Sequence, residues 1–343
     1  MSILANLLFG IRSAILRRGH LVGRMGENHI AVGMSLVYLT LALFSILYFR
    51  SRKQATLRLW GAIGLAIILL AESGLSLRVS WISIYFTPLV WTGYLLFIDA
   101  LVWTLEGRSR LAQAPREFLW LAFWSVPLWL GFETYNLRLQ NWTYVGLPHD
   151  WLRRDFGYLW SFATIWPAIH ETADFVHALG LGREEGKWRL VLGRWGRRVV
   201  FILGLGLVTV PLLVPRRVGS YLFGAIWLGF ALLLDPVNYW WGGHSVLRDL
   251  ERGRSSAVTT FLVSGLVCGL LWEFWNYWAG AKWLYIFRIW QDWKVFEMPL
   301  PGFLGFPFFA LECFVVYEFL RTVRKELVGF LRSPRWEAEG SPP

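Results

Sequence analysis

Nine long apolar runs set the strongest constraint on how this chain folds. They cover residues 31–49, 59–77, 81–105, 118–135, 157–179, 199–214, 221–241, 257–278 and 302–323. A helix that crosses a bilayer needs roughly 17 to 25 predominantly apolar residues, and most of these runs have that length. The sequence therefore predicts an all-α polytopic membrane protein with about nine transmembrane helices. The sixth run is short and contains Pro211, so eight or ten helices are the alternatives.

The composition fits a membrane protein better than a nucleic-acid-binding one. Of the 343 residues, 56% are hydrophobic and 23 are Trp. The net charge of +11 comes from Lys and Arg residues that lie mainly in the loops between apolar runs, where such charges orient membrane proteins. No basic stripe remains for DNA or RNA, so we expect a membrane partner and no nucleic acid.

The distribution of Lys and Arg predicts the orientation. The loops after the odd-numbered runs hold more of them than the N-terminus and the other loops together. Basic residues favour the cytoplasmic side, so we expect a multi-pass protein of the plasma (inner) membrane with a cytoplasmic C-terminus. Arg12, Arg17, Arg18 and Arg24 conflict with this orientation. We interpret "ILANLLFGIRSAILRRG" as an interfacial amphipathic helix or a re-entrant segment.

An internal repeat is the most informative sequence feature. The third and seventh runs, with the loops after them, share four residues at identical spacing: Gly93, Asp99, Gly107 and Ser109 match Gly229, Asp235, Gly243 and Ser245. The fourth and eighth runs each end in Glu-x-x-Asn, followed by Trp-x-Tyr. The residues concerned are Glu133, Asn136, Trp142 and Tyr144, then Glu273, Asn276, Trp283 and Tyr285.

These matches predict two four-helix units, 57–180 and 181–326. A segment of residues 1–56, which holds the first transmembrane helix, precedes them, and a cytoplasmic tail at 327–343 follows. Because four crossings return the chain to the same side, the two units should be parallel and related by a pseudo-twofold axis along the membrane normal. Both Glu-x-x-Asn pairs then reach the same face of the membrane and can build one shared site.

Acidic side chains within the apolar runs are the candidate functional groups. The spacing i, i+3 puts the Glu and Asn of each pair on one helix face. No Lys or Arg lies in the core of the runs. Each buried acid is therefore expected to be protonated, hydrogen-bonded, or balanced by a cation or water. A carboxylic acid that stays neutral is able to donate a proton.

Structural roles remain alternatives for the same residues. Acids near helix ends can reach interfacial water, and Asn side chains can join helices through hydrogen bonds. The Trp and Tyr residues that follow the two pairs are also typical of the aromatic belt at a membrane surface.

A third alternative concerns metal binding. "HETADFVH" places His170, Asp174 and His177 at i, i+4 and i+7, with Glu171 next to them. This is the closest approach to a metal-ligand pattern in the chain. The ninth run has no equivalent histidine, so the sequence favours no metal site and keeps these three residues as a weaker alternative.

The paired motifs bear a likeness to a known family. "EFWNYWAGAKWLY" followed by "GFLGFPFFALECF" has an acid near a span end, a Gly, a Trp-x-aromatic pair, and then a Pro and a Glu in the next run. This order resembles the tandem integral-membrane lycopene cyclase domain and the related membrane carotenoid hydratases. The resemblance covers the third to fifth and seventh to ninth runs. The chain departs from the family's Pro-x-Glu-Glu signature, since Pro307 lies five residues before a single acid, Glu312.

The resemblance implies redox-neutral chemistry on an isoprenoid lipid, without a cofactor. A buried acid would protonate a terminal double bond of a polyene, and aromatic faces would stabilise the carbocation until cyclisation or hydration. The implied catalytic residues are Glu312, Glu171, Glu133, Glu273, Asn136 and Asn276. The expected substrate-binding residues are Trp142, Tyr144, Trp283, Tyr285, Asp99 and Asp235.

Two other functions fit the sequence. Interior acids in two related halves also suit a proton- or cation-coupled carrier. Alternatively, the aromatic residues only fill the bundle of a scaffold or pigment-binding subunit. An enzyme should bury Glu171 and Glu312 against one apolar, aromatic-lined cavity open to lipid. A carrier should show a wet path with broken helices, and a scaffold should lack a cavity of substrate size.

Overall fold

The structure of this chain is a computed structural model that describes residues 27–52, 56–182 and 189–331. The described residues are mostly helical (77%). The N-terminal segment with Arg12, Arg17, Arg18 and Arg24 and most of the expected tail at 327–343 lie outside the described residues, so the predictions made for them stay predictions.

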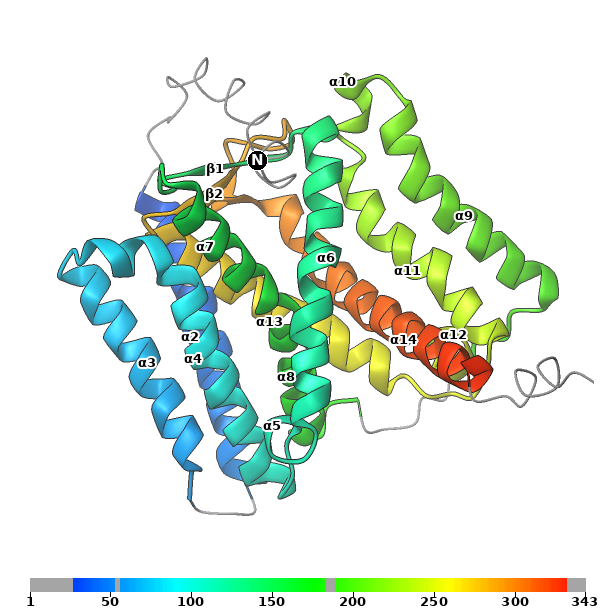
Figure 1. The fold of residues 1–343 in the computed structure, drawn as a ribbon, viewed down its shortest axis with the longest axis horizontal. Coiled ribbons are helices and arrows are strands. Elements are labelled where there is room, and N and C mark those ends of the chain that lie inside the picture. The colour runs from blue at the N-terminus through cyan, green and yellow to red at the C-terminus, as the bar shows by residue number, and fades with distance from the viewer. Residues whose placement is uncertain (1–26, 53–55, 183–188, 332–343) are drawn as a thin grey trace, which may run out of the picture.

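The helices follow the apolar runs closely (Figure 1). Up to residue 182 they are α2 (Glu27–Ser51), α3 (Leu59–Ser76), α4 (Ser80–Glu106), α5 (Arg110–Gln113), α6 (Pro115–Leu139), α7 (Trp151–Ala163) and α8 (Ile165–Ala178). From residue 189 they are α9 (Arg194–Leu213), α10 (Arg216–Gly219), α11 (Phe223–Trp240), α12 (Val246–Glu251), α13 (Ser256–Trp278), the 3-10 helix η1 (Leu300–Leu304) and α14 (Gly305–Leu331).

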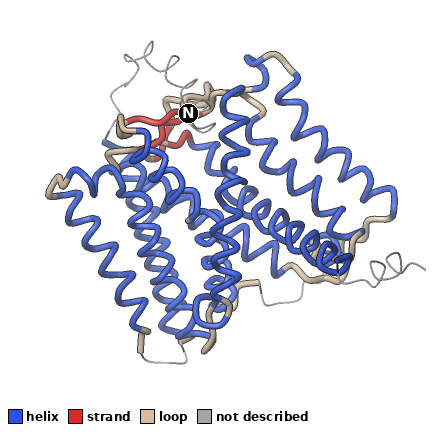
Figure 2. The backbone as a smooth tube through the Cα atoms, in the orientation of Figure 1, coloured by secondary structure: helices blue, strands red, loops and turns tan. Residues whose placement is uncertain are grey.

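Short strands gather at one end of this helical body, as Figure 2 shows. They are β1 (Trp142–Val145), β2 (Lys282–Tyr285), β3 (Lys294–Val295) and β4 (Met298–Pro299). Strand β1 pairs with β2, and β3 pairs with β4, both antiparallel. Because β1 follows α6 and β2 follows α13, the pairing brings the ends of these two helices together.

Six helical segments of the described chain are long and apolar enough to cross a membrane. They lie in α2, α3, α4, α9, α13 and η1 with α14. Large apolar side chains on the outer helices are exposed, among them Leu39 at 67%, Leu70 at 68% and Leu203 at 54%. So many exposed apolar side chains are unfavourable in water and are expected where helices face lipid. The protein is therefore membrane-embedded.

The fifth apolar run departs from its expected form. We expected one helix over 157–179, but the chain divides at Thr164 into α7 and α8. Pro167, in the first turn of α8, has no N–H to continue the helix ladder back to Ala163. Neither half is long enough to count among the six membrane-crossing segments.

Glycines allow helices to pack closely both within residues 57–180 and within residues 181–326. Helix α3 packs along α4, and α9 packs along α11 (Figure 1). A Cβ atom on Gly64 would lie 2.5 Å from the carbonyl oxygen of Gly93, and one on Gly204 would overlap the backbone of Leu233. Small residues that let backbones approach are the usual basis of helix association in membranes. Helices α6, α8, α13 and α14 lie between these two pairs (Figure 1).

Candidate functional site

Two asparagines attach the strands to the helices before them. Asn136 Oδ1 accepts from the backbone N–H groups of Asn141 (2.8 Å) and Trp142 (3.2 Å), and its Nδ2 donates to the Trp142 carbonyl at 3.0 Å. Asn276 makes the same pair of bonds with the N–H and carbonyl of Trp283, at 3.0 and 2.9 Å. Both amides are buried and fix the start of a strand. The expected role of orienting the glutamates therefore stays a prediction.

The strand register collects the predicted aromatic residues on one face. In the β1–β2 ribbon, Trp142 lies opposite Tyr285 and Tyr144 lies opposite Trp283. Residues two apart in a strand point to the same side, and directly opposed residues share a side. All four side chains therefore face the same way, and all four line one cavity.

A buried glutamate lies behind the Trp and Tyr residues of each strand. Glu133 Oε1 accepts from the indole N–H of Trp129 (2.9 Å), the indole N–H of Trp142 (3.1 Å) and the hydroxyl of Tyr144 (2.5 Å). Glu273 Oε1 accepts from the Tyr285 hydroxyl at 2.8 Å. The Oε2 atom of each glutamate is buried without a hydrogen-bond partner among the described residues. Each glutamate thus keeps one oxygen free to carry a proton.

Tyr144 and Tyr285 stay protonated and therefore act as hydrogen-bond donors. Burial, together with the nearby carboxyl group of Glu133, raises the pKa of Tyr144 well above its ordinary value. Burial and Glu273 do the same to the pKa of Tyr285. Both phenols therefore keep their proton at physiological pH and donate it to the glutamate behind them.

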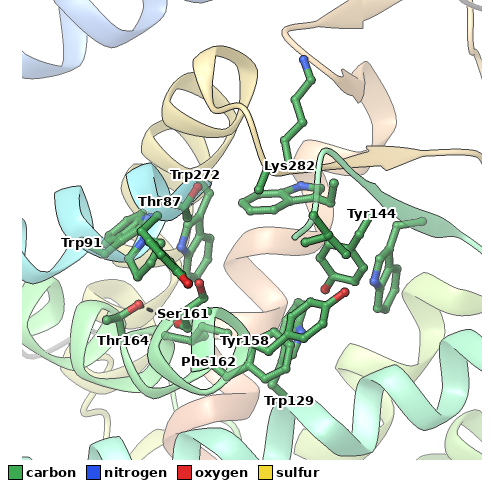
Figure 3. A pocket seen from close by; sticks show the side chains of 18 of the residues that line it. Thr87, Trp91, Trp129, Tyr144, Tyr158, Ser161, Phe162, Thr164, Trp272 and Lys282 are labelled. Atoms are coloured by element: carbon green, nitrogen blue, oxygen red, sulfur yellow. Dashed lines mark hydrogen bonds between the residues drawn. The ribbon is translucent and has the colours of Figure 1, made fainter. Parts of the chain in front are cut away.

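The cavity is partly open and has a volume of about 130 Å³. This is smaller than ordinary small-molecule pockets. Its lining is largely aromatic (Figure 3): Trp91, Trp129, Trp142, Tyr144, Tyr158, Phe162, Trp227, Trp272, Trp283, Tyr285, Phe306 and Phe309. Such a lining suits a mainly apolar or ring-bearing ligand, and Arg153, Arg154 and Lys282 add basic groups to it.

Two irregular helix segments meet at this cavity. In α4, Tyr85 has non-helical dihedral angles (φ −100°, ψ 18°) shortly before Pro88, and the other is the division at Thr164 between α7 and α8. Residues of both segments line the cavity. At membrane depth, irregular backbone is tolerated where it is buried in protein or lines a cavity, which accounts for its place here.

Glu171 lies outside the cavity and is paired with an arginine. Arg110 Nε is 3.5 Å from Glu171 Oε1, and Arg110 Nη2 donates to Asp174 Oδ2 at 2.6 Å. No Lys or Arg in the core of the runs balances these two acids. Their cation comes from α5, in the loop after the third run.

Glu312 is fully buried in α14. Neither of its carboxyl oxygens has a hydrogen-bond partner within the described ranges, and it is not among the residues that line the cavity. It follows Pro307 by five residues, whereas Glu171 follows Pro167 by four. One residue turns a helix by about 100°, so the two acids need not face equivalent surroundings. Their catalytic role stays a prediction.

Asp99 and Asp235 hold the connections that follow their helices. Asp99 accepts from the Leu111 N–H and the Trp60 indole, each at 2.9 Å. Asp235 accepts from the N–H groups of Val246 (2.7 Å) and Leu247 (2.9 Å) and from the Ser245 hydroxyl. Neither acid lines the cavity, and their expected part in substrate binding stays a prediction.

His170, Asp174 and His177 each bond to a different group instead of sharing one ligand. His170 Nδ1 bonds to the Trp166 carbonyl, Asp174 bonds to Arg110, and His177 Nδ1 lies 3.3 Å from the Ser256 hydroxyl. Within the described part of the chain, no group of three or more His, Cys, Asp or Glu side chains is arranged to hold a metal ion.

Sequence reasoning missed several residues of the cavity wall. Thr87 and Trp91 on α4, Trp129 on α6, and Tyr158 and Ser161 on α7 all line the cavity. Pro88, inside an apolar run, was the available signal, because a proline there marks irregular backbone.

Comparisons with protein-family models, with curated proteins and with solved structures found no match.

Proposed function

We propose that this chain is an integral-membrane enzyme that acts on an apolar, carotenoid-like isoprenoid lipid by protonating a double bond. The observation that carries the proposal is the pair of cavity-lining tyrosines, Tyr144 and Tyr285, each hydrogen-bonded to a buried glutamate. We call Glu133 with Tyr144, and Glu273 with Tyr285, the two Glu–Tyr dyads. An acid that reaches a water-poor aromatic cavity through a phenol is suited to this chemistry.

The proposed reaction uses the dyads as acid and base. At one dyad, the glutamic acid is the source of the proton that reaches a terminal alkene carbon. The tyrosine relays it, because its oxygen takes up the acid's proton as it gives up its own, so no phenolate forms. The π electrons form the new C–H bond and leave a tertiary carbocation. Attack by a second double bond forms a ring, and loss of a proton to the other dyad restores an alkene. If water attacks instead, a tertiary alcohol results.

Aromatic side chains would stabilise the cation during this sequence. Trp142 and Trp283 flank the two tyrosines on the ribbon, and Trp129 and Trp272 add faces from α6 and α13. A cation over an indole face is stabilised by about 0.5 to 2 kcal/mol. Proton gain and loss balance in the cyclisation, so no redox cofactor takes part in the proposed reaction.

The proposal includes two related, parallel halves and about nine crossings with a cytoplasmic C-terminus in the plasma membrane. Three sets of equivalent contacts support the halves. Asn136 and Asn276 bond to the strand that follows each, Glu133 and Glu273 accept from the tyrosine in that strand, and Asp99 and Asp235 bind the backbone after α4 and α11. The β1–β2 ribbon has the same relation, because the Trp of each strand lies opposite the Tyr of the other strand.

The other two functions have less support. The irregular segments at Tyr85 and Thr164 both belong to residues 57–180, whereas a carrier of this kind typically breaks helices at corresponding positions of its halves. A scaffold requires no buried glutamate that is hydrogen-bonded to a cavity-lining tyrosine.

The test is lipid extraction and mass spectrometry from a lycopene-producing host. The intact chain should yield cyclic or hydrated product, and Glu133→Gln with Glu273→Gln should abolish it. Glu312→Gln is the comparison variant, because it neutralises a fully buried glutamate that no hydrogen bond among the described residues joins to a cavity-lining tyrosine. Loss of product in this variant alone would assign the role of the acid to Glu312 instead. An unchanged polyene pool with folded, membrane-inserted protein would overturn the proposal.

A further inference from the structure

We propose that the cavity contains an oxygen-binding subsite formed by Thr87, Trp91 and Ser161, which receives a hydroxyl or carbonyl oxygen of the ligand. The inference rests on the proposed function and narrows its substrate class. The ligand would be an isoprenoid with one oxygen-bearing end at this subsite and an alkene end at the dyads.

The hydroxyl of Thr87 is the first part of the subsite. Thr87 is 9% exposed, and its Oγ1 has no hydrogen-bond partner among the described residues. A helical Thr usually donates to the carbonyl four residues before it. Here the carbonyl of Ser83 instead accepts from the N–H groups of Gly280 (3.0 Å) and Ala281 (3.4 Å), in the connection to β2. The Thr87 hydroxyl is thereby left available on the cavity wall.

The indole of Trp91 is the second part. Trp91 lies one helical turn beyond Thr87 on α4, so the two share a helix face. It is 1% exposed and lines the cavity, and its Nε1 has no acceptor in the described part of the chain. Its ring is held between Trp272 and Trp275, at centroid distances of 5.3 and 5.1 Å. The donor therefore cannot turn easily to another partner.

Ser161 completes the subsite from α7. Figure 3 shows Thr87, Trp91 and Ser161 on one side of the cavity and Tyr144 and Tyr158 on the other. The subsite and the first dyad thus lie at opposite sides of an aromatic space.

Hydrogen-bond energetics explain why an oxygen fits there. A buried donor without an acceptor is costly. Three such donors, on Thr87, Trp91 and Trp227, lie in the mainly apolar wall. At the subsite, an oxygen of the ligand accepts from Thr87 and Trp91, while a pure hydrocarbon leaves both unsatisfied. The missing partner therefore favours an oxygenated ligand over a hydrocarbon of the same shape.

The test compares two probes with the purified protein in lipid nanodiscs. They are farnesol and the hydrocarbon of the same skeleton that lacks the hydroxyl, and binding is followed by quenching of tryptophan fluorescence. We expect farnesol to bind roughly fivefold to tenfold more tightly, the effect of about one hydrogen bond. Thr87→Val and Ser161→Ala should bring this ratio close to one.

Two further variants make the result specific. Thr92→Val removes a hydroxyl from the same helix. That hydroxyl already donates to the Pro88 carbonyl, accepts from the Trp160 indole and does not line the cavity, so the ratio should be unchanged. Leu147→Trp enlarges a side chain of the cavity wall and should weaken the binding of both probes.

The outcomes separate the subsite from the proposed function. Equal binding of both probes that is still lost in Leu147→Trp would overturn the subsite alone. A ratio unaffected by Thr87→Val and Ser161→Ala would do the same. Absence of any binding sensitive to Leu147→Trp would overturn the cavity as the ligand site, and with it both proposals.

Discussion

The hydroxyl of Tyr144 donates a 2.5 Å hydrogen bond to Glu133, and this contact joins a strand of the ribbon to the end of helix α6. The bond links a group that faces the cavity to an acid buried behind it. Tyr285 and Glu273 form the same link between β2 and α13 at 2.8 Å. If these links conduct protons, removing the phenol oxygen should interrupt chemistry without disturbing the fold.

Tyr144→Phe and Tyr285→Phe should each lower product formation at least about 100-fold, the usual contribution of a general acid or base. Product per unit of folded protein, measured by mass spectrometry, checks this. Tyr158→Phe is the matched control, because it makes the same change in the same cavity at a residue that no hydrogen bond in the described structure joins to either glutamate. An equal loss in Tyr158→Phe would contradict the role of the dyads.

Asn136→Leu and Asn276→Leu should destabilise the protein by about 2 kcal/mol each, because buried backbone groups at the strand starts lose their partners. Thermal unfolding in detergent, followed by near-ultraviolet circular dichroism of the tryptophans, provides the measurement. Gln113→Leu, at an exposed amide in α5, should leave the transition in place. Unfolding temperatures that match the intact protein would show that the amides do not hold the ribbon.

Gly204→Val should disrupt the packing of α9 on α11, since a Cβ at this position would overlap the backbone of Leu233. Gly206→Val on the same helix has no neighbour within 4 Å of the added Cβ and should be tolerated. Expression level and unfolding temperature compare the two variants. Similar behaviour of both would contradict the close helix approach.

Arg110→Met should destabilise the protein by about 3 kcal/mol, because it leaves the buried Glu171 without its cation. Adding Glu171→Gln should restore much of the lost stability, as expected for groups that interact directly. Denaturant unfolding of both single variants and the double variant measures the coupling. Strictly additive losses would mean that the two side chains do not interact.

Part of this structure could be predicted from the sequence because it depends on local pattern. Apolar runs predicted the helices, since each helix in a bilayer needs its own apolar length. The repeated Glu-x-x-Asn and Trp-x-Tyr motifs directed attention to Glu133, Glu273 and the aromatic pairs that line the cavity. The division at Thr164 was missed because it does not interrupt the apolar pattern.

The remaining features depend on contacts between distant segments. "WTYV" and "KWLY" alternate like strands, but only their mutual pairing distinguishes a cavity wall from an interfacial belt. Arg110 reaches Glu171 from a loop, and the Thr87 hydroxyl is left free because Gly280 and Ala281 occupy the Ser83 carbonyl. No local pattern in the sequence encodes which partner a polar group finds or fails to find.

Deuterium incorporation is the measurement that tests the central claim most directly. Membranes containing the intact chain would be incubated in D₂O with unlabelled lycopene and with its monohydroxylated derivative, and the products examined by mass spectrometry. Protonation by a Glu–Tyr dyad predicts one carbon-bound deuterium for each end that has reacted, and no product from the Glu133→Gln, Glu273→Gln double variant. A product without carbon-bound deuterium, or no conversion of either lipid by folded protein, would contradict the account.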